Sequence, residues 1–472
     1  MQTIYPDVYA HHQPDCILPA DFFEGRYIPD VHPESLEWDQ WWDEQIDRCM
    51  DGYSNGGYSV TGPYYYHLNF KHINLMYPDG KIDWNFPYFS SEDQQLFNDF
   101  DEAFSEGKGL CLITARGFGK SFSVASICEH KFIFYPASEV VVSASTAPNV
   151  DKLWGKIDVG FNTVHPEIRP NLLTDKFGNW ESGFKEGATK YGYRAKMEKI
   201  VYDDNPGKTR GGRPNIQVFE EVGSWSGPAS LKACWKKTEP SWWRGGRRTC
   251  LPVLIGTGGE MDTGASVDAK HFAMNPDVYD LKSFIYDKLD GSQGKGAKFY
   301  PAYRKFSDYY ESTGISDVDG AKSFLEARRE KKKSDPEIYR QETAEFPFFL
   351  EEAFRVTGGT VLPAAIMEER FMEIERDDEL MKRVQVGYFK PKLTAKGHLI
   401  NLTFIQDKSG PVHILEHPKK IKRQDDEQEI IVPKLYISGC DSYDSVADKV
   451  DEDLEASEAS GKSKGSIFMF KR

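Results

Sequence analysis

The segment 109–134 restricts the possible folds of this chain more than any other part of its sequence. It begins with the apolar run GLCLIT (109–114), which has the length and composition of a buried strand. The glycine-containing turn ARGFG (115–119) follows directly, and KSFSVASICEHKFIF (120–134) then has the character of a helix. A strand that enters a helix through a glycine-containing turn is the arrangement of a phosphate-binding loop. The segment therefore predicts an α/β fold that holds a nucleotide at the start of this helix.

The residue types in the loop suit phosphate binding. Glycines 117 and 119 let the backbone curl with its N–H groups pointing inward, and the helix dipole adds positive potential. Lys120 would reach the β- and γ-phosphates, and the Ser121 hydroxyl would ligate Mg²⁺. Thr114 departs from the consensus, which has glycine there, and a chance G-K-S in a turn is the alternative. We expect ATP and Mg²⁺ as cofactors, with the nucleotide bound by Gly117, Phe118, Gly119, Lys120 and Ser121.

A second strand that ends in carboxylates should accompany such a loop. Residues 215–221 read NIQVFEE, in which a largely apolar strand leads into two adjacent acids. Glu220 would hold Mg²⁺ through water, and Glu221 would polarise the attacking water, because the metal and the nucleophile need separate carboxylates. Aspartate is the usual residue at the first of these positions. The alternative is that the pair is only a solvated strand end.

Strand-like and helix-like segments alternate through the middle of the chain. Apolar runs at 139–145, 216–219 and 251–257 are separated by helical patterns, which predicts a mostly parallel sheet with helices on both faces. We therefore predict a P-loop NTPase fold of the ASCE type. At 472 residues the chain is also too long for one ordinary core, so further domains are expected.

Changes in sequence character divide the chain into four predicted parts. Residues 1–90 form an aromatic-rich extension packed on the nucleotide-binding domain, in which 64–70 and 73–77 pair as a hairpin. The ATPase domain occupies 91–300, and a charged helical lid and linker follows at 301–370. The part 371–472 is β-rich.

Composition excludes several classes of protein. No run approaches the roughly eighteen apolar residues of a membrane span, and the N-terminus does not resemble a secretion signal. The seven cysteines form no C-x-x-C pair, which disfavours a zinc ribbon and a disulfide framework and favours a reduced, intracellular setting. A net charge of −15 excludes a uniformly basic DNA coat but allows local cationic patches.

Three details of these motifs together resemble the large terminase family of tailed bacteriophages. The phosphate loop contains an arginine, Arg116, as the loops of that family commonly do. The basic, glycine-rich segment TRGGRP (209–214) precedes the acidic strand, and IGTGG (255–259) follows the third strand and is similar to the family's coupling motif. The family often has proline where this chain has Gly258. The resemblance covers roughly residues 60–470, and it includes TAEFPFFLEEAFRVTGG (343–359), which is similar to a stretch near the family's bridge to the nuclease.

The resemblance implies roles for three further residues of the motor. Arg116 would act in cis as a sensor or finger near the γ-phosphate, where it stabilises charge on the transferring phosphoryl group. Thr257 matches the hydroxyl residue that senses the ATP state in the coupling motif. Gln94 looks like the glutamine that contacts adenine, with Gln95 as the neighbouring alternative and a surface glutamine without function as the other.

The resemblance also implies an RNase H-like α/β nuclease domain, of which 371–472 would be the beginning. Asp441 takes the place of its first metal-binding aspartate, with Asp444 as the alternative, and Mg²⁺ or Mn²⁺ would serve a complete site. Only one more strand follows, so the expected partner carboxylates are missing. We expect no competent nuclease in this chain.

The function implied by the resemblance is ATP-driven packaging of double-stranded DNA into a procapsid. The expected partners are double-stranded DNA, a portal protein, a small terminase subunit and further copies of the chain in a ring, with no membrane. The expected location is the host cytoplasm and, transiently, the portal vertex of the procapsid, but not the mature virion. The alternatives are a helicase-like or remodelling ATPase and a non-hydrolysing nucleotide-binding scaffold.

Residues 232–248 (KACWKKTEPSWWRGGRR) are the densest mixture of cations and aromatic residues in the chain. This stretch could face DNA or a neighbouring subunit. The alternative is that its tryptophans belong to the core and its cations are merely solvated.

Overall fold

The structure is a computed structural model, and it divides into two compact units, Met1–Met367 and Glu368–Arg472. It describes residues 13, 15–76, 82–209, 211–257, 265–289, 291–306, 309–354, 383–393, 399–407, 410, 412–414, 420–422, 429–431, 436–441 and 466–471. Each unit is described by itself. Among the described residues, no helix has the length and apolar character needed to cross a bilayer.

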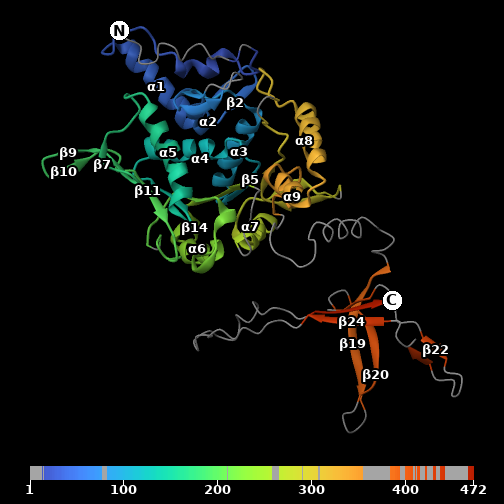
Figure 1. The fold of residues 1–472 in the computed structure, drawn as a ribbon. Coiled ribbons are helices and arrows are strands. Elements are labelled where there is room, and N and C mark those ends of the chain that lie inside the picture. Colours follow the sequence, from blue (N-terminus) through green and yellow to red (C-terminus); the bar gives the residue numbers. More distant parts are fainter. Residues whose placement is uncertain are drawn as a thin grey trace. The chain divides into compact units, whose positions relative to one another are not determined.

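An eight-stranded sheet forms the centre of the first unit (Figure 1). Its strands pair in the order β18-β5-β15-β12-β6-β11-β8-β7. From β18 to β11 every neighbouring pair is parallel, whereas β8 and β7 join antiparallel at one edge. The bounds are β5 (Leu110–Thr114), β6 (Glu139–Ala144), β7 (Leu172–Lys176), β8 (Asn179–Ser182), β11 (Lys196–Val201), β12 (Ile216–Glu220), β15 (Leu251–Thr257) and β18 (Lys298–Tyr300).

The strand order confirms the predicted fold class. The loop strand β5 is separated from the acidic strand β12 by one additional strand, β15, which pairs parallel with both. This inserted strand, together with the carboxylates at the end of β12, is the arrangement that the ASCE type of P-loop NTPase requires. The part predicted as RNase H-like is not covered by this finding.

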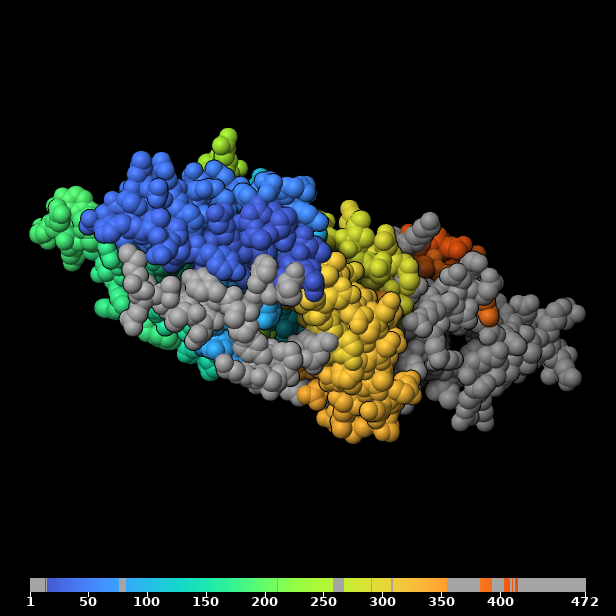
Figure 2. Space-filling model, turned by 90° about the horizontal axis from the view of Figure 1, so that it is seen from above, coloured from blue at the N-terminus to red at the C-terminus, as the bar shows by residue number. Residues whose placement is uncertain are grey.

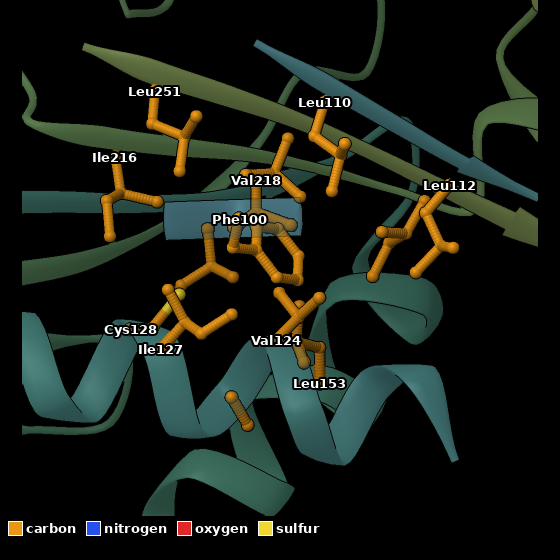
Figure 3. Packing of buried hydrophobic residues seen from close by; sticks show 14 of the residues in the cluster. Phe100, Leu110, Leu112, Val124, Ile127, Cys128, Leu153, Ile216, Val218 and Leu251 are labelled. Carbon is orange, nitrogen blue, oxygen red and sulfur yellow. The ribbon is translucent and has the colours of Figure 1, made fainter. Parts of the chain in front are cut away.

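Helices cover both faces of the sheet (Figure 1). One face carries α3 (Ser91–Ser105), α4 (Lys120–Phe134) and α5 (Ala147–Thr163), and the other carries α6 (Leu231–Thr238) and α7 (Ala265–Met274). Figure 3 shows Val124, Ile127 and Cys128 pointing from α4 toward strand side chains such as Leu110 and Val218. All five are buried in one continuous core, and burial of apolar surface stabilises such layers by about 25 cal/mol per Å².

The N-terminal segments pack on the α4 side of the sheet. They comprise η2 (Ala20–Arg26), α1 (Leu36–Asp51), β1 (Tyr53–Asn55), β2 (Tyr58–Val60), α2 (Gly62–Asn69), β3 (Ile73–Met76) and β4 (Ile82–Asn85). The prediction that 64–70 pairs with 73–77 was wrong, because 64–69 lies in α2 and β3 pairs with β4 instead. Every residue of α2 except the half-buried Pro63 is buried, so its sequence has no amphipathic period that would have revealed a helix.

A lid of two helices follows β18. It contains α8 (Val318–Lys332), α9 (Pro336–Glu345) and the short η7 (Leu350–Phe354). Asp317 and Asp335 cap the two helices by accepting bonds from backbone N–H groups of the first turns. Leu325 and Phe348 of the lid share a small core with Ala115, the residue that opens the phosphate loop. Figure 2 shows these segments, in yellow and orange, beside the N-terminal segments in blue.

The remaining elements of the first unit are short. They are η3 (Val222–Ser224), η4 (Gly227–Ala229), η5 (Glu239–Trp242), η6 (Pro276–Tyr279), and the hairpins β9 (Phe184–Glu186) with β10 (Thr189–Tyr191), β13 (Trp243–Arg244) with β14 (Arg247–Arg248), and β16 (Phe284–Asp287) with β17 (Gln293–Gly296).

The described part of the second unit contains antiparallel strands. They are β19 (Gln385–Leu393), β20 (Leu399–Gln406), β21 (Val412–Ile414), β22 (Lys420–Lys422), β23 (Glu429–Ile431), β24 (Tyr436–Asp441) and β25 (Ser466–Lys471). β24 pairs with β25, so that Asp441 at the end of its strand faces Ser466 across the ladder. The predicted metal-binding role of Asp441 concerns a side chain outside the described part, as Asp444 is altogether. Both roles stay predictions.

Candidate nucleotide-binding site

The backbone of the phosphate loop depends on two glycines. Gly117 has φ +87° and Gly119 has φ +93°, which are left-handed conformations that other residues adopt only at a cost of roughly 1–2 kcal/mol. Gly119 is also the N-cap of α4 and offers no side chain there, so the first N–H groups of the helix keep no side-chain cap. The helix N-terminus is therefore free to bind an anion, as the sequence predicts.

The end of β12 places a buried carboxylate directly beside the loop. The Ser121 hydroxyl donates to Glu220 Oε1 over 3.3 Å. The other oxygen, Oε2, is buried without a hydrogen-bond partner, and the Glu220 residue is 5% exposed. Mg²⁺ prefers such oxygen ligands, and an orphaned carboxylate oxygen next to a hydroxyl fits that ion. The two residues predicted to hold the metal of the motor are thus brought together.

Burial shapes the charges of this corner. It raises the pKa of Glu220 to about 7, an effect that Lys120 opposes and the negative charge of Glu221 reinforces. Burial also lowers the pKa of Lys120, against the attraction of Glu221 and Glu220. For Glu220 and for Lys120, the effect of burial on the pKa is therefore larger than the opposing effect of the neighbouring charges. A phosphate beside Lys120 and a divalent cation beside Glu220 would supply the missing opposite charges.

The inserted strand β15 brings Thr257 to the second acid. Its hydroxyl donates to Glu221 Oε1 over 2.7 Å. Glu221 itself has φ +50°, which is unusual for a residue with a β-carbon and costs on the order of 1–3 kcal/mol. This conformation ends the strand, and its carbonyl accepts bonds from the backbone N–H and the hydroxyl of Ser224. Glu220 and Glu221 consequently have different partners, as their separate predicted roles require.

Arg116 lies on the loop but contacts the lid. Its Nε donates to Glu345 Oε2 over 2.5 Å and its Nη2 to Oε1 over 3.0 Å, while its backbone N–H donates to the Glu345 carbonyl over 3.3 Å. Glu345 is the last residue of α9, and 68% of the Arg116 side chain is exposed. The predicted finger is thus bound to a carboxylate 229 positions away in the sequence.

The side chains of Phe118 and Gln94, both predicted to contact the nucleotide, contact other residues of the protein. The Phe118 ring is 3% exposed and stacks on Tyr300 at 4.7 Å, so only its backbone is available to a nucleotide. The Gln94 amide donates to the Ser59 carbonyl on β2 over 2.7 Å, and Gln95 donates to Asp99 over 3.1 Å. The adenine contact of Gln94 remains a prediction.

A cavity of about 660 Å³ adjoins the loop on the lid side. Residues 115–118 form one wall, and the others include Arg304, Tyr309, Phe324 and Arg328. None of these lid residues stood out in the sequence, because they belong to no contiguous motif. Lys156 on α5 was missed as well: it is close enough to Glu220 to help hold the pKa of that carboxyl down. No local pattern could have revealed it.

The other resemblance motifs are only partly described. In the segment before β12, Thr209 is buried, and its hydroxyl lies 2.7 Å from Tyr202 Oη and 2.8 Å from Thr238 Oγ1, whereas Arg213 is exposed and Arg210 lies outside the described residues. Gly258 and Gly259 lie outside them too. Within the described residues, no group of three or more His, Cys, Asp or Glu residues is arranged to hold a metal ion.

Comparison with known proteins gives similarity at the level of structure. No protein-family model matches the sequence, and no curated protein sequence matches it significantly. A variant of the large terminase ATPase domain of Thermus phage P74-26 is 13% identical, with a TM-score of 0.37 over 53% of this chain and 92% of that one. The large terminase of bacteriophage HK97 is 14% identical, with a TM-score of 0.34 over 57% and 51%. The Legionella pneumophila ATPase DotB is 12% identical, with a TM-score of 0.22 over 57% and 82%.

Proposed function

We propose that the protein is an ATP-hydrolysing motor that drives double-stranded DNA into a viral procapsid. One observation carries the ATPase part of this proposal. Ser121 beside Glu220, and Thr257 beside Glu221, form two separate contacts at one end of three adjacent parallel strands. Binding of a nucleotide with its magnesium ion needs a hydroxyl and a carboxylate close together, as Ser121 and Glu220 are. Cleavage of the nucleotide also needs a second carboxylate, held separately, as Glu221 is.

The residues divide the work of hydrolysis between them. The curled backbone at Gly117 and Gly119 would bind the phosphates, with Lys120 at the β- and γ-phosphates. Ser121 and Glu220 would hold Mg²⁺, which when bound neutralises phosphate charge. Glu221 would accept the proton of the attacking water.

Thr257 would fix the position of the Glu221 carboxylate by its hydrogen bond. Through β15, Thr257 would also link the state of the nucleotide to the rest of the sheet. Arg116 must leave Glu345 to reach the γ-phosphate.

The DNA-packaging part of the proposal is supported by the motif set that resembles large terminases. It includes binding of double-stranded DNA, a ring of identical subunits, and contacts with a portal protein and a small terminase subunit. It also includes residence in the host cytoplasm and at the portal vertex during packaging.

Single-turnover hydrolysis by the wild type and by Glu221→Gln tests the ATPase. Removal of a general base costs about 10²–10⁴-fold, so we expect the variant to bind ATP normally and to hydrolyse it at least 100-fold more slowly. Normal ATP binding is measured as the thermal stabilisation that ATP gives. Equal hydrolysis by the two proteins would exclude the catalytic role of Glu221, and absence of hydrolysis in the wild type would favour a non-hydrolysing scaffold.

A further inference from the structure

The hairpin β13–β14 has two arginines directly opposite each other at its tip. Arg244 pairs with Arg247, and the pair before it is Trp243 with Arg248. We propose that the Arg244–Arg247 pair binds the phosphate backbone of double-stranded DNA. This inference rests on the proposed function, since it assigns one DNA contact of the motor.

The turn fixes the register of the hairpin. Gly245 has φ +54° and Gly246 has φ +83°, so both central residues of the two-residue loop are left-handed, as a type I′ turn requires. Such a turn matches the twist of the strands and does not allow a slip by one residue. The side chains of Arg244 and Arg247 therefore leave the same face of the hairpin, with β-carbons roughly 5 Å apart.

This arrangement is electrostatically unfavourable without a ligand. Like charges directly opposite each other on two strands destabilise a hairpin. Both arginines are exposed, and neither has a carboxylate partner within the described part of the chain, although the protein has a net charge of −15. A phosphate between the two guanidinium groups would accept hydrogen bonds from both and turn the repulsion into attraction.

Arg248 anchors the hairpin, so Arg244 and Arg247 are not needed for that purpose. Its Nη1 donates to the Asp280 carbonyl over 2.8 Å, and its guanidinium lies 5.3 Å from the Trp242 ring and 5.7 Å from the Trp243 ring. Trp242 is fully buried. Arg248 and Trp242 thus fix the hairpin to the body of the protein, while Arg244 and Arg247 make no comparable contact with any described residue.

Another hairpin of this unit, β9–β10, also has two facing cations, and one of them has a carboxylate contact. Lys185 on β9 pairs directly with Lys190 on β10. There, Lys190 Nζ lies 3.4 Å from Glu181 Oε2, and Glu186 is the next residue on the strand. Within the described residues, one cation of the β9–β10 pair therefore has a carboxylate contact, to a Glu181 that also binds Arg194, whereas neither arginine of the β13–β14 pair has one.

The neighbourhood favours a repeating polyanion over a small anion. Lys236 and Lys237 are exposed in the last turn of α6, which leads through η5 into the hairpin. The exposed aromatic residue, Trp243, pairs with Arg248 and so leaves the opposite face from Arg244 and Arg247. Contacts to phosphates carry no sequence information, so binding through this pair is expected to be independent of the DNA sequence.

Binding of a 30-base-pair duplex by Arg244→Glu/Arg247→Glu, measured by fluorescence anisotropy at several salt concentrations, tests the proposal. The matched control is Lys185→Glu/Lys190→Glu, which makes the same change of charge on the other hairpin. We expect the arginine variant to bind at least 10-fold more weakly and to lose about 2 from its salt slope, because each lost phosphate contact removes about 0.9. We expect less than a threefold effect in the control.

An equal loss in both variants would reduce the effect to net charge and overturn the proposal, as would unchanged binding by the arginine variant. Equal affinity for polyglutamate of the same charge would overturn it in favour of an acidic protein partner. ATP hydrolysis without DNA is measured in parallel and should not change. If the arginine variant hydrolyses ATP and binds DNA as the wild type does, this inference is wrong but the proposed ATPase is unaffected. If the wild type itself does not hydrolyse ATP, the proposed function is wrong.

Discussion

Arg116 leaves the phosphate loop toward α9, where both oxygens of Glu345 accept its hydrogen bonds. The resemblance to large terminases implies a role for this arginine near the γ-phosphate, but the contact in the structure belongs to the lid. The pair is mostly exposed on the arginine side, and exposed ion pairs contribute only about 0.2–1 kcal/mol. A contact of this strength positions the arginine but can be broken readily. The proposed hydrolysis would require this residue to exchange Glu345 for the γ-phosphate.

Glu345→Gln should raise the rate of ATP hydrolysis if Arg116 acts on the γ-phosphate. The substitution weakens a contact worth up to about 1 kcal/mol, so the expected increase is at most about fivefold. Steady-state ATPase rates of the wild type, Glu345→Gln and Arg116→Ala measure it. Arg116→Ala should be slower than the wild type and should abolish the effect of the Glu345 substitution. An equal increase in the double variant would show that Glu345 acts on something other than Arg116.

The N-terminal elements are attached to the helices on the sheet through histidines that burial keeps neutral. His130 on α4 bonds to the Cys49 carbonyl on α1 over 2.6 Å, and burial lowers its pKa to about 4. His67 on α2 bonds to Ser126 on α4 over 2.7 Å, and burial lowers its pKa well below the usual value. His165, after α5, stacks on Trp42 of α1 at 4.5 Å. The interface between these elements is therefore sensitive to acid.

The free energy of unfolding should fall as the pH falls from about 6.5 to about 4. A histidine in the unfolded chain takes up its proton near pH 6.5, whereas native His130 does so only near pH 4, so in this window protons favour the unfolded state. The shift corresponds to an upper bound of about 3 kcal/mol for this residue. His130→Gln keeps a donor for Cys49 and removes the titration. Urea unfolding at pH 7 and pH 4.5 should show a smaller loss for the variant than for the wild type.

That prediction would fail if both proteins lost the same stability over this range. His32→Gln serves as the control, because it makes the same substitution at an exposed histidine.

On the scale of the whole molecule, the proposed ATPase site lies entirely within one unit. The phosphate loop, the two acids, Thr257 and Glu345 all fall within Met1–Met367, and the eight-stranded sheet is complete there. The second unit begins at Glu368 and contains its own antiparallel pairs. The boundary between the two units lies between Met367 and Glu368, and the division into four parts stays a prediction.

A fragment of residues 1–367 should fold and hydrolyse ATP. Because it contains every residue assigned to hydrolysis, its basal rate should lie within about threefold of the full chain, and Glu221→Gln should inactivate it equally. The measurements are the ATPase rate and the thermal unfolding transition of both proteins. A fragment that unfolds cooperatively but does not hydrolyse ATP would show that the second unit takes part in the site.

The phosphate loop, the acidic strand and the alternation of strands with helices could all be predicted from the sequence, because each depends on residues that are neighbours in the chain. A glycine turn between an apolar run and a helix has few other solutions. The helix α2 was predicted wrongly because segments that are distant in the sequence bury it. Its residues therefore show no alternation of apolar and polar positions. The residues on the lid side of the loop could not be predicted for the same reason.

The sequence by itself determined that this protein contains a loop able to bind phosphates and a strand ending in two acids. Only the tertiary structure decided that β15 lies between them, because strand order follows from packing and not from adjacency in the chain. That order brings Thr257 to Glu221. Packing of the lid likewise decided that Arg116 meets Glu345, since a contact across 229 positions is set by how whole elements bury their apolar faces.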